Sequence, residues 1–348
     1  PAPPSALRPS AGYRIRAVGE PSQLTAPAAA NSACSVERPA RIARLDSLIR
    51  STMADYGGTY TVTVRQLGGL SEVVSIGSGE RREPASMMKI FAAWAALKIV
   101  EQGRASLSTV LPSGVSLGTC LQVMIHASDN YCHSDIVHWI SLPEVNRMIR
   151  AAGFVNTFYG NVAPGTSVLY AGNRSTSNDL AWMMQRLDDA SILSRPLADH
   201  LLNLMGSQIF RNRIASGLPP GIKQSSKPGA LWIASGLMQG DTAVVWGGRY
   251  KYTISIIGDG NPPQAALRAI SRVVYQHLNG AFGAAVVYPV QQMVTVRATA
   301  LRTSAGGPLT VAIPAGTPLE VLDANRIWYQ VQYGSRKLWT IYSDLRNR

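Results

Sequence analysis

The chain has 348 residues, 46% of them hydrophobic, and a formal net charge of +13, so it is long enough to bury a full globular core. No run of eighteen apolar residues occurs, and we therefore expect no transmembrane segment. The charge comes mostly from 27 arginines spread along the sequence and favours anionic surroundings. No helix-turn-helix, zinc-finger or aromatic RNA-binding signature accompanies it, so we expect no nucleic-acid partner.

The first 38 residues are rich in Pro, Ala, Ser and Arg, a composition that does not support a packed core. We expect a flexible tether over residues 1–38, in a mature chain from which an export signal has been removed. Apolar residues at helical spacing then predict an amphipathic helix from about residue 40 to 54. Two β-rich segments, 59–65 and 72–76, are separated by a Gly-Gly pair and predict a hairpin.

Ser86 lies three positions before Lys89, at the head of an apolar helical segment that ends at Gly103. This spacing places a hydroxyl and an amine on one helical face. A serine hydroxyl needs a neighbouring base to act as a nucleophile, and a lysine buried among apolar residues can lose its proton near neutral pH. The pair is a candidate for covalent catalysis, although a capping serine and a solvated lysine also explain the spacing.

Residues 116–153 have a helical pattern with breaks at 128–130 and 141–144, the second of which is a capping box with a proline in the first turn. Cys120 and Cys132 flank the first break, whereas Cys34 lies in the predicted tether. We predict a Cys120–Cys132 disulfide, with two buried free thiols as the alternative. A disulfide would place the chain outside the cytosol.

The rest of the chain divides into two parts. A loop over 154–173 precedes helices from Ser177 and Ser194, a hairpin of strands 241–246 and 252–257, and a helix over 262–278. This order predicts a sheet assembled from both ends of the chain with a helical insert between them. Residues 281–348 contain short, turn-punctuated strand segments and predict a small β-barrel.

Three motifs occur in order along this pattern: Ser86-Met87-Met88-Lys89, Ser128-Asp129-Asn130 and Lys227-Pro228-Gly229-Ala230. They resemble the three motifs of the penicillin-recognising serine enzymes, the class A β-lactamases and related D,D-peptidases (penicillin-binding proteins). The resemblance implies an α/β (α+β) class A β-lactamase-like fold over 39–280, with an antiparallel sheet flanked by helices and an all-helical subdomain. Residues 281–348 resemble a bacterial SH3-like barrel, a kind of module that commonly binds cell-wall peptides; the alternative is a domain that only packs on the enzyme.

The resemblance also implies a role for each motif residue. Ser86 would be the acylated nucleophile and Lys89 its proton acceptor, and Ser128 would pass the proton to the leaving nitrogen. Lys227 would hold Ser128 and the carboxylate of the substrate. Three further residues would bind substrate, with the amides of Ser86 and Ala230 forming the oxyanion hole: Asn130, Gly229 and Ala230.

Two departures from the family pattern bear on function. Pro228 stands where the third motif usually has Thr or Ser, so a hydroxyl that contacts the substrate carboxylate is missing. Four nearby residues are candidate substitutes: Ser225, Ser226, Arg211 and Arg213. Class A β-lactamases also carry a Glu that activates the deacylating water, in a loop that corresponds here to 159–173. This chain has no Glu between Glu144 and Glu320, and no Asp in that loop.

These features predict an exported serine acyl-transfer enzyme that resembles a D,D-peptidase more than an efficient β-lactamase, with peptidoglycan or its peptides and β-lactams as partners. Three alternatives stay open: a β-lactamase with another deacylation base such as Lys89, an esterase for a different acyl group, and a non-catalytic wall-binding protein. The five histidines lack a paired ligand pattern, so we expect no metal or cofactor, although His133 is placed to support the Ser128 turn.

Overall fold

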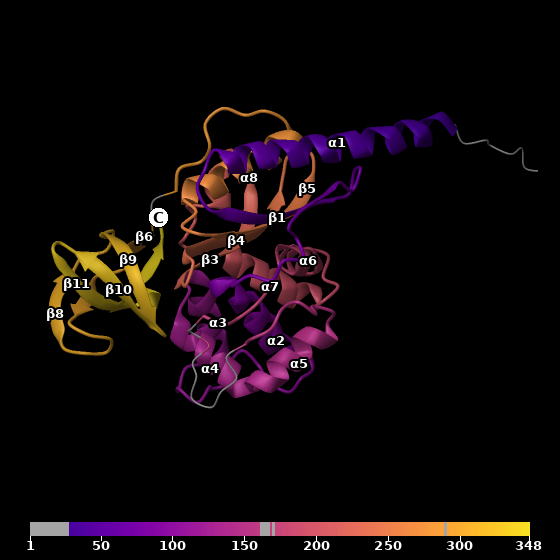
Figure 1. The fold of residues 1–348 in the computed structure, drawn as a ribbon. Coiled ribbons are helices and arrows are strands. Elements are labelled where there is room, and N and C mark those ends of the chain that lie inside the picture. Colours follow the sequence, from indigo (N-terminus) through magenta and orange to yellow (C-terminus); the bar gives the residue numbers. More distant parts are fainter. Residues whose placement is uncertain (1–27, 161–167, 169–170, 289–290) are drawn as a thin grey trace, which may run out of the picture.

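The computed structural model describes residues 28–160, 168, 171–288 and 291–348 (Figure 1). Helix α1 spans Ala28–Ala54 and begins well before residue 40, so residues 28–38 are helical and are not part of a tether as expected. Three consecutive alanines at its start have the highest helix propensity, and Pro39 is accommodated inside the helix with the loss of one backbone donor. The rest of the predicted tether lies outside the described residues.

A five-stranded antiparallel sheet has the order β2-β1-β5-β4-β3, and it joins strands from both ends of the core chain as predicted. Its strands are β1 (Thr59–Leu67), β2 (Val73–Ile76), β3 (Lys223–Ile233), β4 (Gly236–Trp246) and β5 (Lys251–Asp259). Helices α1 and α8 (Gln264–Asn279) cover one face, where Leu45 and Ile49 share a core with β1, β5 and α8 (Figure 1). Strand β3 is left at the edge of the sheet.

A helical insert lies against the other side of the sheet (Figure 1). It contains the short 3-10 helix η1 (Ala85–Met88), α2 (Lys89–Glu101), α3 (Leu117–His126), α4 (Asn130–Ile140), α5 (Leu142–Ala151), α6 (Ser177–Asp188) and α7 (Arg195–Gly206). Helix α2 is buried on nearly all sides, because its apolar residues face neighbours all round rather than along one stripe. Half of the predicted capping box is present, since Ser141 accepts a hydrogen bond from the amide of Glu144, whereas the Glu144 carboxylate binds Arg147 and the Ser141 amide donates to His138.

The C-terminal β-module, residues 292–347, is a seven-stranded antiparallel sheet with the order β12-β6-β9-β10-β11-β7-β8. Its strands are β6 (Gln292–Thr295), β7 (Thr299–Arg302), β8 (Leu309–Ile313), β9 (Pro318–Asn325), β10 (Trp328–Tyr333), β11 (Arg336–Ile341) and β12 (Leu345–Asn347). The module lies beside α3 and α4 of the helical insert (Figure 1). Within the described part of the chain, no helix is both long and apolar enough to cross a membrane.

Candidate active site

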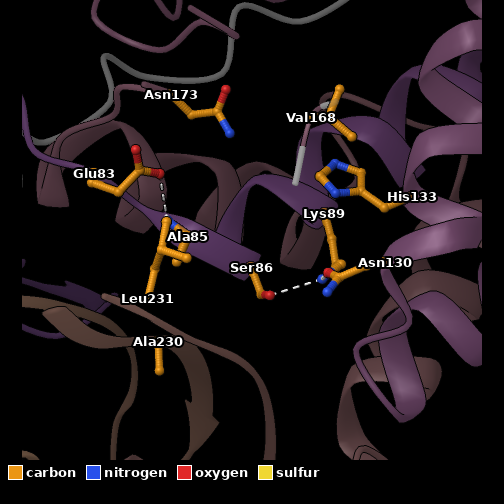
Figure 2. Close-up of a pocket in the computed structure, with 10 residues that line it drawn as sticks. All are labelled: Glu83, Ala85, Ser86, Lys89, Asn130, His133, Val168, Asn173, Ala230 and Leu231. Atoms are coloured by element: carbon orange, nitrogen blue, oxygen red, sulfur yellow. Dashed lines mark hydrogen bonds between the residues drawn. The ribbon is translucent and has the colours of Figure 1, made fainter. Parts of the chain in front are cut away.

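The Ser86–Lys89 pair lies at the junction of η1 and α2, with Lys89 fully buried in the apolar core of the insert. Lys89 Nζ is 2.8 Å from Ser86 Oγ, and Figure 2 shows the two side chains pointing toward each other. Burial lowers the pKa of Lys89 to about 7, while the charges of Asp129 and Asp323 oppose this shift. The predicted pairing of a hydroxyl with an amine that can lose its proton near neutral pH is therefore present.

The turn between α3 and α4 brings the second motif to this pair. Lys89 Nζ lies 2.9 Å from the carbonyl oxygen of Ser128, 3.2 Å from Ser128 Oγ and 2.8 Å from Asn130 Oδ1. Ser128 has φ +58°, a left-handed conformation that non-glycine residues rarely adopt. The strained backbone directs both its carbonyl group and its side chain toward the lysine.

The third motif approaches from the edge strand β3. Lys227 Nζ donates to Ser128 Oγ at 3.0 Å and to the carbonyl oxygen of Pro228 at 3.3 Å. Burial, and then the charge of Lys89, hold the pKa of Lys227 well below its ordinary value, while Asp241 opposes the shift. Two ammonium groups so close together in a buried site repel each other, so the site disfavours protonation of both lysines at once.

Gly229 allows β3 to pass directly beside η1. A Cβ at this position would lie 2.6 Å from the carbonyl oxygen of Pro84 and 3.1 Å from the amide nitrogen of Ser86, so only glycine fits without displacement. The close approach places Ala230 with Ser86 in the lining of the same cavity. The two residues whose amides are predicted to form the oxyanion hole therefore line one cavity.

Two hollows adjoin Ser86. The first is a cavity of about 70 Å³ (Figure 2), and the second, of about 210 Å³, lies on the β3 side. Pro228 lines the second hollow, and an edge strand tolerates a proline that lacks an amide proton. Of the four candidate substitutes for the missing hydroxyl, Arg213 alone lines this hollow among the described residues.

The other three substitutes are engaged elsewhere. Ser225 Oγ donates to the carbonyl oxygen of Leu202 at 2.6 Å, and Ser226 Oγ accepts from Gln208. The guanidinium of Arg211 lies over the ring of Tyr288, 4.3 Å from its centroid. Arg213 lines the hollow beside Pro228, although its Nη2 donates to Gln239 Oε1 at 3.0 Å.

Glu83 is a site residue that the sequence motifs did not indicate. It lines the 70 Å³ cavity together with Ser86, and its two carboxylate oxygens accept from the amides of Ala85 at 3.1 Å and Gly172 at 2.7 Å. Burial raises the pKa of Glu83, although these bonds and the charge of Arg174 oppose the shift. Its position three residues before Ser86 was the only available signal, because its contact with residue 172 spans a large part of the chain.

Asn173 and His133 complete the cavity (Figure 2). Asn173 is 3% exposed, and its Oδ1 has no hydrogen-bond partner among the described residues. His133 Nε2 lies 2.7 Å from Tyr159 Oη, and burial holds the pKa of His133 well below its ordinary value. The expected loop over 159–173 contributes Asn173 and Val168 to the site, while residues 161–167 and 169–170 lie outside the described residues.

Cys120 and Cys132 form a disulfide with an S–S distance of 2.08 Å, joining α3 to α4 on either side of the Ser128 turn. The side chain of Cys34 is outside the described residues. Among the residues described, the one cluster of potential metal ligands is Cys120, Cys132 and Asp135. Both sulfur atoms of this cluster are committed to the disulfide, so it is not a metal site.

Comparison with known proteins identifies a family and a fold. The family model described as "Beta-lactamase enzyme family" matches residues 43–278. No curated protein matches the sequence. Among solved structures, the chain is similar to a β-lactamase from Xanthomonas campestris pv. campestris, with 19% identity and a TM-score of 0.61 over 69% of this chain and 99% of that one.

Three further solved structures, of a class A β-lactamase and of PBP-A, are also similar to the chain. An ancestral class A β-lactamase has 18% identity and a TM-score of 0.59, with 67% of this chain and 99% of that chain covered. PBP-A has 22% identity and a TM-score of 0.59, with coverage of 67% and 95%. A PBP-A mutant solved as an acyl-enzyme complex with penicillin G is 23% identical, with a TM-score of 0.58 and coverage of 68% and 96%. At these identities the likeness establishes the fold.

Proposed function

The chain belongs to the β-lactamase enzyme family and is a serine hydrolase with a class A β-lactamase-like fold; on this premise we propose that it is a D,D-peptidase of the penicillin-binding type. Its substrates would be peptidoglycan peptides, and β-lactams would acylate the same serine. The observation that carries the proposal is the contact of Lys89 with both Ser86 and Ser128, since it links a nucleophile, a base and a proton carrier.

In the acylation step, Ser86 Oγ attacks the substrate carbonyl carbon and its proton passes to neutral Lys89. The two N–H groups of the neutral amine donate to the Ser128 carbonyl oxygen and to Asn130 Oδ1, which leaves its lone pair directed at Ser86. The amides of Ser86 and Ala230 stabilise the oxyanion. When the tetrahedral intermediate collapses, Ser128 delivers a proton to the leaving nitrogen and recovers one from protonated Lys89.

Two cations serve the remaining steps. Lys227, 3.0 Å from Ser128 Oγ, favours transient negative charge on that oxygen as its proton moves. Arg213, 6% exposed and lining the hollow beside Pro228, binds the substrate carboxylate in place of the absent hydroxyl. Its Nη2 donates to Gln239 Oε1 at 3.0 Å, and its Nε has no partner among the described residues.

The same proposal includes an extracytoplasmic location. A disulfide is characteristic of oxidising compartments, and a net charge of +13 suits an anionic cell wall. The C-terminal β-module would be SH3-like and hold the enzyme on wall peptides. No part of this assignment requires a cofactor.

A β-lactamase is the second candidate function, favoured by the presence of both Glu83 and Asn173 in the lining of the cavity that contains Ser86. A carboxylate with a raised pKa, and an amide oxygen that has no partner in the described part of the chain, are suitable groups to hold and activate a water. In a D,D-peptidase the same water would release the peptide, but the acyl group of a β-lactam would persist. In a β-lactamase the water would release both the peptide and the acyl group of the β-lactam.

The test is intact mass after penicillin G, the ligand of the acyl-enzyme complex of the PBP-A mutant. A long-lived adduct in the native protein that is lost in Ser86→Ala supports the D,D-peptidase. Rapid hydrolysis without accumulation favours the β-lactamase. A protein that forms no adduct yet binds isolated peptidoglycan would be a non-catalytic wall-binding protein.

The variant Glu83→Gln distinguishes the proposed D,D-peptidase from the β-lactamase. If Glu83 activates the water, the adduct should persist longer in this variant by about a hundredfold. Glu80→Gln is the matched control, because Glu80 is an exposed carboxylate of the same segment that pairs with Arg82. An unchanged adduct lifetime in Glu83→Gln would remove Glu83 from β-lactam hydrolysis.

A further inference from the structure

The turn between β9 and β10 of the C-terminal β-module contacts the Ser128 turn directly. The amide of Arg326 donates to Asp129 Oδ2 at 3.0 Å, and the other carboxylate oxygen of Asp129 accepts from the amide of Cys132 at 2.6 Å. Asp129 is buried, and both of its oxygens are engaged by backbone donors. One carboxylate thus links the first turn of α4 to a residue nearly two hundred positions away in sequence.

The side chain of Arg326 holds the same helix at a second point. Its Nε and Nη2 donate to the two carboxylate oxygens of Asp135 at 2.7 and 3.0 Å, and its guanidinium lies 5.4 Å from the centroid of the Tyr131 ring. A bidentate pair of this kind fixes orientation as well as distance. Arg326 therefore contacts α4 through both its backbone and its side chain.

The module also holds the end of α3, on the other side of the turn. His126 Nδ1 lies 3.1 Å from Tyr329 Oη, and His126 Nε2 lies 2.7 Å from Asn347 Oδ1. Asn347 in turn donates to the carbonyl oxygen of Ser207. The last residue of α3 and the first turn of α4 are thus both tied to the C-terminal β-module.

Ser128 lies between these two anchored ends in its left-handed conformation. Such a conformation persists in a non-glycine residue only when the surrounding structure enforces it. The disulfide between α3 and α4 supplies one constraint, and the module supplies the other. Since Ser128 is the residue that meets both Lys89 and Lys227, a small displacement of the turn would separate all three groups.

We propose that the C-terminal β-module is a positioning element of the active site, in which Arg326 holds Asp129 and Asp135 and thereby keeps Ser128 aligned with the two lysines. Arg326 is a positioning residue and touches neither substrate nor the reacting atoms. The inference rests on the proposed role of Ser128 for its effect on rate, but the alignment itself can be measured without substrate.

The decisive variants are Arg326→Ala and Asp135→Asn in the full-length protein, which remove the same ion pair from opposite sides. Arg336→Ala is the control, because Arg336 is an exposed arginine of the same module, on β11. We expect each of the first two variants to slow acylation by penicillin G about tenfold at saturating ligand, with little change in the half-saturating concentration. The double variant should be no slower than either single one.

Amide hydrogen exchange supplies the readout that is independent of activity. Peptides covering residues 127–131 should exchange faster in Arg326→Ala and Asp135→Asn than in Arg336→Ala, while the strands of the five-stranded sheet stay unchanged. Arg326→Lys, which retains the charge and one donor, should recover part of both effects. Exchange and acylation that match the control in both decisive variants would overturn the proposal. If the native protein is not acylated at all, the proposed function fails, but exchange still decides the positioning role.

Discussion

Lys89 and Lys227 approach the same hydroxyl group from opposite elements, with their Nζ atoms 3.2 and 3.0 Å from Ser128 Oγ. One lysine comes from the buried helix α2 and the other from the edge strand β3. Because the two positive charges would repel each other, the site favours a state in which only one of the two lysines is protonated. The hydroxyl between them is then the natural route for that proton.

The pH dependence of acylation should report Lys89. Its pKa of about 7 means that the neutral base is lost as the pH falls below that value. The rate of acylation by a chromogenic β-lactam should fall about tenfold for each pH unit below the pKa. Lys89→Arg should be inactive across pH 5–9, because a guanidinium stays charged throughout. A flat profile in the native protein would show that Lys89 is not the base.

Burial of Lys89 should also make stability depend on pH. The pKa is 10.5 in the unfolded chain and about 7 in the folded protein, so between these values the unfolded state binds more protons and stability rises with pH. Relative to Lys89→Met, the free energy of unfolding of the native protein should increase by about 1.4 kcal/mol per pH unit from 7 upward. Urea denaturation at several pH values measures this difference, and parallel curves would contradict it.

Gly229→Ala should impair catalysis without unfolding the protein. The added methyl group would meet the carbonyl oxygen of Pro84 at 2.6 Å, forcing β3 away from η1 and separating the two amides of the oxyanion site. We expect the acylation rate to drop about a hundredfold, the effect of losing one oxyanion donor. Gly79→Ala is the control, since a Cβ at Gly79 meets nothing within 4 Å. Equal rates in the two variants would place the oxyanion site elsewhere.

Arg213→Gln should weaken recognition of carboxylate-bearing ligands selectively. The residue lines the hollow beside Pro228, and a charge-assisted bond to a carboxylate contributes roughly 1.5–3 kcal/mol. The acylation efficiency with penicillin G should fall at least about tenfold, whereas a penicillin methyl ester should react equally with both proteins. If both ligands lose efficiency to the same degree, Arg213 has a structural role.

Reduction of the disulfide should destabilise the helical insert. Cys120 and Cys132 are separated by twelve positions, and closing a loop of that size stabilises a protein by about 3 kcal/mol. A reducing agent should lower the free energy of unfolding by this amount in the native protein and in Cys34→Ala. The reducing agent should leave the free energy of unfolding unchanged in the double variant Cys120→Ala/Cys132→Ala. Equal denaturation curves with and without reductant in the native protein would refute this contribution.

The motif residues could be predicted because each motif is short and lies at a recognisable element boundary. Ser86 and Lys89 begin a buried helix, Ser128 follows the end of another, and Lys227 precedes a glycine on a strand. The β-lactamase-like fold followed from their order, and the structural similarities agree with it. The assembly of the sheet from both ends of the core chain was also predictable, since the β-rich segments lie on either side of a long helical stretch.

Other features depend on contacts between distant segments and left no local signal. Glu83 enters the site through its bond to Gly172, and Asp129 is fixed by Arg326. The early start of α1 was missed for a different reason. The predicted tether is rich in Pro and Ser, a composition that indicates a segment without a packed core. Its alanines nevertheless favour a helix, and the C-terminal part of that helix packs on the sheet.

The five-stranded sheet joins strands from both ends of the core chain, and this arrangement determines when the protein can become active during synthesis. Strands β1 and β2 emerge first, but their partner β5 follows the entire helical insert, and the turn containing Arg326 comes later still. Contacts of such long sequence separation form slowly and late. An incomplete chain would therefore carry Ser86 and Lys89 without the geometry to use them. Enzymatic activity would begin only when nearly the whole polypeptide has been made and folded.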